Sequence, residues 1–246
     1  MLLLFDVGNT NICITTFDDV LNESIIRITT LLNRSSDEYF LILREMIHFD
    51  CIDNVAISSV VPDITTILKE MCIKYLNNDP LIIGPGVKTG VKIIADNPRE
   101  VGSDLICDVA GVCDEEALII DLGTAIKYIY AKKGSLCGVV ISPGVAVSIK
   151  ALSKNAALLP EIEIKTPKKV LGNNTISCMQ SGVTYGVASQ VDGMIERIKE
   201  EVGNPNLKVI ATGGLANLII PLTKHDIKID NLLTLRGLLE VYRRNL

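Results

Sequence analysis

The apolar positions at the start of the chain form a short continuous run that ends abruptly in polar residues. Residues Met1–Phe5 are apolar, and the stretch Asp6-Val7-Gly8-Asn9-Thr10-Asn11 follows directly. A bounded apolar run of this length predicts a buried strand, and glycine with short polar side chains is typical of a tight turn. The run Ile12–Phe17 is rich in β-branched residues. The pattern therefore predicts a strand that returns as a β-hairpin.

The predicted turn has the chemistry of a phosphate and metal site. Exposed N–H groups in a glycine turn bind anions well. A carboxylate at the end of a buried strand, as expected for Asp6, is costly unless a cation or hydrogen-bond donors meet it. Carboxylate oxygens hold Mg²⁺, directly or through water. We therefore expect the first hairpin to bind phosphate together with Mg²⁺.

The same pattern occurs again in the second half of the chain. The apolar run Ala117–Ile120 precedes Asp121-Leu122-Gly123-Thr124-Ala125, and Ile126–Ala131 predicts a second returning strand. One such turn is weak evidence for a function, whereas two at matching places indicate an internal repeat at domain scale. Two turns, each with an aspartate, would hold a polyphosphate and its metal from two sides.

Strands and helices alternate along the rest of the chain, which predicts an α/β fold. We expect two lobes, residues 1–114 and 115–246, with ATP between them and the last helix packed back across the first lobe. Further strands are predicted over residues 21–30, 54–60, 81–83, 91–94, 135–141 and 207–211. Helices are predicted over residues 38–48, 63–77, 104–113, 145–154, 176–202, 215–222 and 233–245.

Three of the candidate site segments also have purely structural interpretations. Gly102 and Ser103 can cap a helix, which puts Asp104 in its first turn, where a carboxylate compensates the helix dipole. Thr175 can act only as a helix N-cap, and Thr212-Gly213-Gly214 can be only a tight strand-to-helix turn. For each segment, the local sequence leaves open both a role in the candidate site and a purely structural role.

Composition excludes several classes of protein. The 246 residues are 48% hydrophobic and carry a net charge of −5, which argues against the basic surface of a nucleic-acid-binding protein. No apolar run approaches the roughly 20 residues that span a bilayer. Asp6 interrupts the first apolar run too early for a signal peptide. We therefore expect no nucleic-acid partner and no membrane association.

The reactive side chains point to chemistry based on carboxylates. The seven cysteines are scattered without a CxxC pair or zinc spacing, and we expect free thiols in a reducing cytoplasm. His48 and His225 are the only histidines, so few residues are available for a catalytic Ser–His–Asp arrangement. Phosphoryl transfer needs neither residue type, because positioning and charge neutralisation supply most of its catalysis.

The ordered set of motifs resembles one family. Phosphate-type turns at Asp6–Thr10, Asp121–Thr124 and Thr212–Gly214 resemble those of the actin, heat-shock ATPase and sugar-kinase superfamily. The match narrows to the type III pantothenate kinases over essentially the whole chain. No single motif is specific, but the ordered set is. It comprises Asp6–Asn11, Asp96–Asp104, Asp121–Thr124, Ile141-Ser142-Pro143-Gly144, Asn174-Thr175, Met179-Gln180-Ser181-Gly182 and Thr212–Ala216.

This resemblance implies a fold and an activity. The fold would be a two-lobed, duplicated actin-like (ribonuclease H-like) α/β fold with mixed sheets and flanking helices. The activity would be ATP-dependent phosphorylation of pantothenate to 4′-phosphopantothenate, the first step of coenzyme A biosynthesis. It also implies ATP as co-substrate, Mg²⁺, a monovalent cation (K⁺ or NH₄⁺), and a homodimer with the substrate site near the subunit interface.

The resemblance also implies roles for individual residues. Asp104 would be the general base for the pantothenate hydroxyl, Asp6 would serve Mg²⁺, and Asp121 would bind the monovalent cation. The implied ATP-binding residues are Asp6, Val7, Gly8, Asn9, Thr10, Asn11, Ile12, Cys13, Thr124, Gly213 and Gly214. The implied pantothenate-binding residues are Ala95, Gly102, Ser103, Asp104, Leu105 and Thr175.

The chain departs from the family pattern near the implied acceptor and cation sites. Leu105 stands where the family has arginine, and Ala95 where it usually has tyrosine. Ile126, Lys127 and Ile129 replace two threonines and an aspartate. Leucine supplies none of the charge or donors of arginine. Three interpretations stay open: a pantothenate kinase with a remodelled acceptor pocket, a non-catalytic nucleotide or metabolite sensor, and a kinase for another small alcohol.

Lys127 suggests a specific hypothesis, in which its ammonium group replaces the monovalent cation. Because side chains alternate along a strand, Lys127 should point to the same face as Ala125 and away from Thr124. This expectation argues against the replacement of the cation by Lys127. The alternative is a solvated lysine at the end of a strand. The hypothesis predicts activity that is independent of added K⁺ or NH₄⁺.

Overall fold

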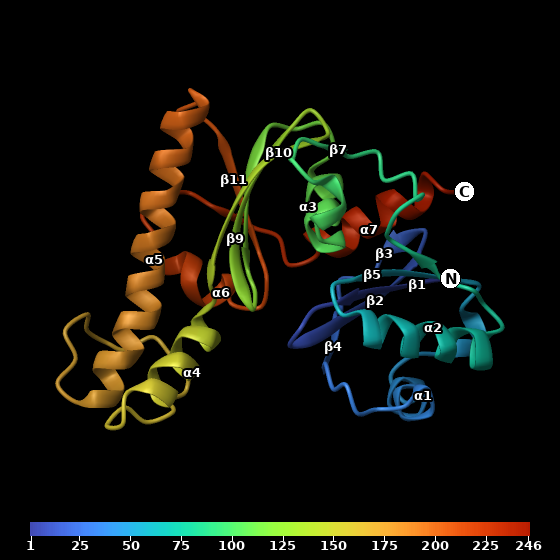
Figure 1. Ribbon diagram of the computed structural model, residues 1–246, viewed down its shortest axis with the longest axis horizontal. Helices are drawn as coiled ribbons and strands as arrows, with labels where there is room; N and C mark the ends of the chain where they lie inside the picture. The colour runs from blue at the N-terminus through green and yellow to red at the C-terminus, as the bar shows by residue number, and fades with distance from the viewer. The chain divides into compact units, whose positions relative to one another are not determined.

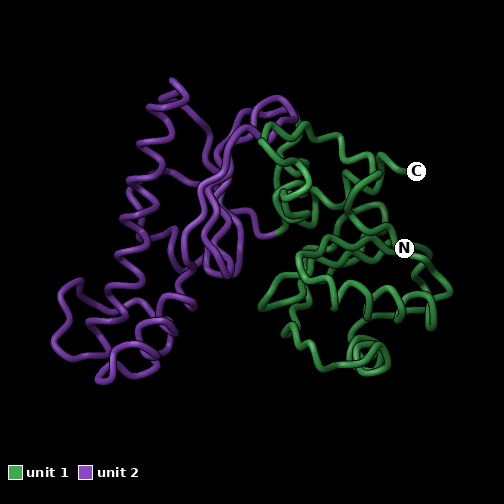
Figure 2. Tube along the Cα trace, in the orientation of Figure 1, with its two compact units in different colours: residues 1–113, 232–246 green, residues 114–231 purple.

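The computed structural model describes residues 1–246, which form two compact units (Figures 1 and 2). Unit 1 contains Met1–Cys113 and Leu232–Leu246, and unit 2 contains Asp114–Asn231. Each unit has its own sheet and its own hydrophobic core. The expectation that the last helix packs with the first half is confirmed, because that helix contacts α3, β1 and β5 of unit 1.

Unit 1 is built around the predicted N-terminal hairpin. Strand β1 pairs antiparallel with β2 and parallel with β5, and the sheet order is β3-β2-β1-β5-β6, with β4 also paired to β2. The strands are β1 (Leu2–Val7), β2 (Asn11–Asp18), β3 (Val20–Leu21), β4 (Ile26–Thr29), β5 (Asn54–Ser59), β6 (Leu81–Ile82) and β7 (Lys92–Ile93). The helices are α1 (Ser36–Arg44), α2 (Pro62–Leu76), α3 (Ser103–Val112) and α7 (Leu233–Arg243), with short 3₁₀ turns at Phe49–Cys51 and Pro98–Glu100.

Both faces of the unit 1 sheet are covered, which explains the continuous apolar run of β1. Leu3 and Phe5 pack on one side in the core that includes Tyr39 of α1, whereas Leu2 and Leu4 pack on the other side with residues of α3 and α7. Because side chains alternate along a strand, Asp6 lies on the face that α3 and α7 cover. The fold thus directs this carboxylate toward α3.

Unit 2 repeats the sheet topology of unit 1. Strand β8 pairs antiparallel with β9 and parallel with β11, and the order is β12-β11-β8-β9-β10. The strands are β8 (Ala117–Leu122), β9 (Ala125–Lys132), β10 (Ser135–Pro143), β11 (Lys208–Thr212) and β12 (Lys228–Ile229). The helices are α4 (Val145–Asn155), α5 (Thr175–Val202) and α6 (Ala216–Ile219), with a 3₁₀ turn at Ile220–Leu222. The predicted duplicated α/β architecture with mixed sheets is therefore confirmed.

Some predicted elements have different bounds for identifiable reasons. The strand predicted over residues 21–30 is split into β3 and β4, since Thr15 Oγ1 donates hydrogen bonds to the carbonyl oxygens of Asn22 (2.8 Å) and Ser24 (3.2 Å). Helix α1 ends at Arg44 rather than near residue 48. The N–H groups of Met46 and Ile47 both bond to the Leu43 oxygen, and the tightened chain buries Ile47.

Candidate active site

The turn of the first hairpin is held in place by the strand next to it. The Gly8 N–H donates to the Asn11 oxygen at 3.0 Å, and the Thr30 hydroxyl donates to the Gly8 oxygen at 2.7 Å. The Thr30 N–H donates to the Thr10 oxygen at 3.0 Å. Asn9 and Asn11 are exposed. The structure therefore presents the predicted phosphate turn as an ordered, solvent-facing loop.

Asp6 lies at the root of this turn and close to the start of α3. It is half-buried, opposite Cys13 in β2 and Ser58 in β5. Ser58 donates a hydrogen bond to the Ser103 hydroxyl at 3.1 Å, and Ser103 donates to the Ser59 oxygen at 2.9 Å. These bonds attach the first turn of α3 to the end of β5. The sheet thereby positions both Asp6 and the helix that carries Asp104.

Asp104 occupies the first turn of α3, as the sequence predicts. Its Oδ1 accepts a hydrogen bond from the Leu105 N–H at 2.8 Å, and a Cβ added at Gly102 would lie 2.5 Å from the same oxygen. Burial raises the pKa of the Cys107 thiol well above its ordinary value, a hydrogen bond with Ser58 lowers the pKa, and the charges of Asp6, Asp108 and Asp104 raise it. The Ser58–Ser103 hydrogen bond links the residue opposite Asp6 in β5 to the residue next to Asp104 in α3. Unit 1 brings the predicted base and the predicted Mg²⁺ ligand into one region.

The second and third glycine turns meet within unit 2. The Gly144 N–H donates to the Thr124 oxygen at 3.1 Å, and the Leu215 N–H donates to the Leu122 oxygen at 3.2 Å. Gly213 has a φ of +94°, and a Cβ there would lie 2.5 Å from Asp121 Oδ1. Only glycine combines this backbone conformation with such a close approach. The motifs around Asp121 and Gly213 thus form one cluster, although many residues separate them in the sequence.

Lys127 is paired with Asp121 and largely buried, so the interpretation as a solvated lysine is wrong. Its Nζ lies 2.5 Å from Asp121 Oδ2, and the two side chains are only 17% and 15% exposed. In the β8–β9 ladder Asp121 is directly opposite Lys127, so the two side chains share one face of the sheet. Thr124 lies in the turn outside β9, so the alternation of side chains along β9 does not determine how Lys127 lies relative to Thr124.

The residues implied for pantothenate binding lie in different settings. Ala95 is exposed in the segment that follows β7, whereas Leu105 is buried on α3 at 9% exposure. Thr175 is the exposed first residue of α5. The N-cap is Asn174, whose Oδ1 accepts from the Ser177 N–H at 2.9 Å, so the interpretation of Thr175 as an N-cap is wrong.

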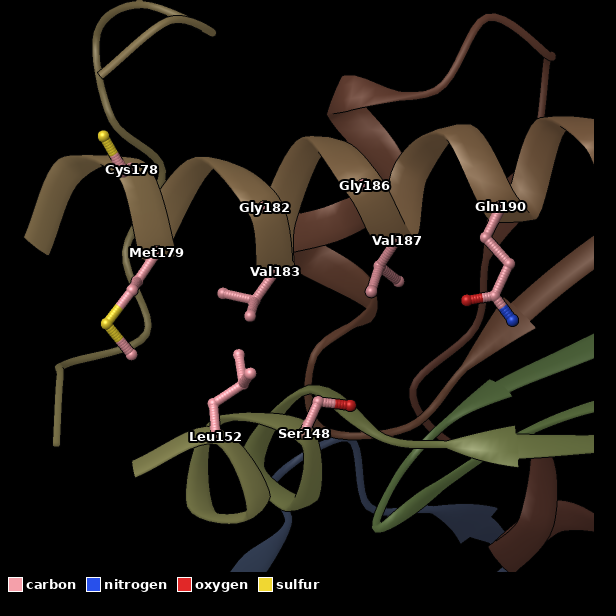
Figure 3. A pocket seen from close by; sticks show the side chains of 9 residues that line it. All are labelled: Ser148, Leu152, Cys178, Met179, Gly182, Val183, Gly186, Val187 and Gln190. Carbon is pink, nitrogen blue, oxygen red and sulfur yellow. The ribbon is translucent and has the colours of Figure 1, made fainter. Parts of the chain in front are cut away.

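A pocket of about 520 Å³ lies between α4 and α5 of unit 2 (Figure 3). Figure 3 shows Leu152 and Ser148 of α4 facing Val183 and Val187 of α5 across it. None of the residues predicted for ATP, pantothenate or cation binding lines it. We therefore do not assign the reaction to this pocket.

The structure holds no arrangement of three or more His, Cys, Asp or Glu side chains suited to a metal ion. Mg²⁺ is normally bound by one or two carboxylates together with waters and phosphates. A single carboxylate beside a phosphate turn, as at Asp6, fits that mode of binding. No helix is long and apolar enough to cross a membrane.

Sequence comparison identifies close relatives over the full chain. A family model described as type III pantothenate kinase matches residues 2–197. A type III pantothenate kinase from Acholeplasma laidlawii is 49% identical over 247 residues, which cover 100% of both chains. One from Syntrophus aciditrophicus is 42% identical over 257 residues, again covering 100% of both chains.

Comparison with solved structures shows a related fold at low sequence identity. A Campylobacter jejuni protein described as a Baf family transcriptional activator has a TM-score of 0.64 and 18% identity, covering 99% of this chain and 98% of that one. A Sinorhizobium meliloti protein described as a 2-dehydro-3-deoxygalactonokinase has a TM-score of 0.61 and 9% identity, covering 99% and 96%. At these identities the likeness shows the fold alone.

Proposed function

Because this chain belongs to the type III pantothenate kinase family, we propose that it converts pantothenate to 4′-phosphopantothenate with ATP, the first step of coenzyme A biosynthesis. The observation that carries the proposal is the 49% identity over the whole chain to a type III pantothenate kinase. No comparison supports a non-catalytic sensor or a kinase for another alcohol. The departures at Leu105 and Ala95 then alter the acceptor pocket of a working enzyme.

In unit 1, the proposed roles follow from the geometry of the first hairpin and α3. The turn over residues 6–13 binds the ATP phosphates through its N–H groups, and Asp6 holds Mg²⁺. Mg²⁺, when bound, neutralises charge on the phosphates. Asp104 accepts the proton of the pantothenate hydroxyl, and its bond from the Leu105 N–H fixes the direction of the carboxylate. A carboxylate is a sufficient base because the acceptor is an alcohol whose proton leaves as the phosphoryl group arrives.

In unit 2, the cluster of glycine turns supplies the remaining contacts to ATP. Thr124 and Gly214 are exposed beside Asp121, and Gly213 holds the turn close to that carboxylate. Thr175, exposed at the start of α5 and not used as its N-cap, contacts pantothenate. Ala95 and the first turn of α3, Gly102–Leu105, line the pantothenate site. Leu105 is apolar, so it offers pantothenate neither the charge nor the donors of the family's arginine, and its side chain is mostly buried.

We also propose that the protein is a homodimer in the reducing cytoplasm. Unit 2 exposes large apolar side chains that a partner subunit would cover, among them Ile141 at 65%, Leu152 at 42% and Ile176 at 51% exposure. All seven cysteines are free thiols. Sedimentation velocity should show a species of twice the chain mass at micromolar concentration. A monomer at all accessible concentrations would contradict the dimer.

The activity is tested by coupled release of ADP from Mg-ATP with pantothenate and with a panel of other small alcohols. We expect ADP formation that depends on pantothenate, with 4′-phosphopantothenate detected by mass spectrometry. Absence of turnover on pantothenate, while ATP binding is measured directly, would contradict the proposal. Turnover on another alcohol alone would show that the acceptor pocket has changed its substrate.

A further inference from the structure

The carboxylate of Asp121 already has a cation as its partner. The Lys127 ammonium nitrogen lies 2.5 Å from Asp121 Oδ2, within the range of a charge-assisted hydrogen bond. Both side chains are more than four-fifths buried. The pairing is fixed by the hairpin itself, because the two residues are directly opposite in the β8–β9 ladder. Backbone hydrogen bonds therefore hold the ammonium group at this carboxylate.

The other carboxylate oxygen is enclosed by the glycine turns. A Cβ added at Gly213 or at Gly123 would lie 2.5 Å or 3.2 Å from Asp121 Oδ1. The carboxylate thus meets an ammonium group on one side and close-packed backbone on the other. A second, free cation would share one negative charge with Lys127. Asp121 and its surroundings therefore do not fit the monovalent cation that the family resemblance implies.

The residue at the equivalent position in unit 1 is a cysteine. There Asp6 is opposite Cys13 in the β1–β2 ladder, as Asp121 is opposite Lys127 in the β8–β9 ladder. In unit 2 the residue opposite the aspartate is therefore a lysine, whereas in unit 1 it is a cysteine, and the cationic residue of that row, Arg27, lies one strand further away on β4. This difference matches the proposed roles, in which Asp6 holds Mg²⁺.

We propose that the Lys127 ammonium group is a built-in replacement for the free monovalent cation and supplies the positive charge beside the Thr124 turn that binds ATP. This inference rests on the proposed ATP-binding role of that turn. Lys127 is a positioning residue, because it acts through Asp121 and the turn. It makes nucleotide binding independent of K⁺ and NH₄⁺.

The test measures Mg-ADP affinity by calorimetry in choline, K⁺ and NH₄⁺ salts at constant ionic strength, so that general screening is the same in each. We expect the wild-type affinity to stay within about two-fold across the three salts. Lys127→Ala should bind about ten-fold or more weakly in choline, since it leaves a buried carboxylate without its cation, and NH₄⁺ or K⁺ should restore most of the loss. Lys127→Met fills the space without a charge, so its loss should persist in every salt.

The control is Lys132→Ala, on the same strand. Lys132 is exposed and pairs with Glu116 at 3.2 Å, so its removal should leave ADP affinity unchanged in all salts. A wild-type protein whose affinity depends strongly on K⁺ or NH₄⁺ would overturn the inference, as would an unchanged affinity of Lys127→Ala in choline. If the alanine variant does not fold, the wild-type salt series still tests whether ADP binding depends on K⁺ or NH₄⁺, and Lys127→Met still tests the charge of Lys127. ADP binding needs no pantothenate, so failure of this inference is distinct from failure of the proposed kinase activity.

Discussion

Replacing Asp104 with asparagine is expected to lower the turnover number by about 10²–10⁴-fold, the usual contribution of a positioned general base. The asparagine oxygen can still accept the hydrogen bond from the Leu105 N–H, which the aspartate accepts at 2.8 Å. The side chain therefore keeps its shape and place but cannot take a proton. Mg-ATP affinity, measured by calorimetry, should stay near that of the wild type.

The competing explanation is that Asp104 only compensates the dipole of α3. Asp63 provides a matched control, since it occupies the same position in the first turn of α2 and is exposed. Removing either charge should cost about 0.3–1 kcal/mol of stability if the dipole is the only role. Asp63→Asn should keep full turnover. Turnover of Asp104→Asn within a few-fold of the wild type would remove the residue from catalysis.

The fold was largely predictable because its elements are marked by local signals. The apolar run of β1 ends at Asp6, and Pro62 is the first residue of α2. Helix α5 ends at Val202, and Gly203 caps it with a φ of +68°. Each signal acts within a few residues, so the sequence contains it directly. The two-residue strand β12 was not predicted. Its pairing with β11 depends on tertiary contact, which leaves no periodic pattern in so short a segment.

The candidate site was predictable where its residues are close in sequence. It was less predictable where the register between two strands determines which side chains meet. The glycine turns and the place of Asp104 on α3 follow from their own segments. The meeting of Lys127 with Asp121 depends on which residues of β8 and β9 face each other. In the first hairpin, Val7 is opposite Ile12, so four residues connect the last paired positions. In the second hairpin, Leu122 is opposite Ile126, so only three residues connect them. With the spacing of the first hairpin, in which Asp6 is opposite Cys13, Asp121 would be opposite Tyr128, so the shorter connection places Lys127 beside the aspartate instead.

Gly237→Ala is expected to destabilise unit 1 by about 3 kcal/mol, at the upper end of the usual cost of overpacking a core. Gly237 lies on α7 where it crosses α3, and an added Cβ would overlap the Cys107 carbonyl oxygen and lie 2.9 Å from the Gly111 nitrogen. These are backbone atoms, so a side-chain rotation cannot relieve the overlap. The two helices must separate, which also strains the bond from Thr234 Oγ1 to the buried Asp108 at 2.6 Å.

The matched control is Gly193→Ala in the middle of α5, where an added Cβ meets no atom within 4 Å. Alanine is the better helix former, so this change should be neutral or stabilise by up to about 1 kcal/mol. Denaturant unfolding measures both variants, and hydrogen exchange should quicken in α3 and α7 for Gly237→Ala alone. Because α3 carries Asp104, a folded Gly237→Ala protein should also lose turnover. A loss of stability below about 0.5 kcal/mol, the scale of ordinary surface changes, would show that α7 can shift without disturbing the helix that positions the base.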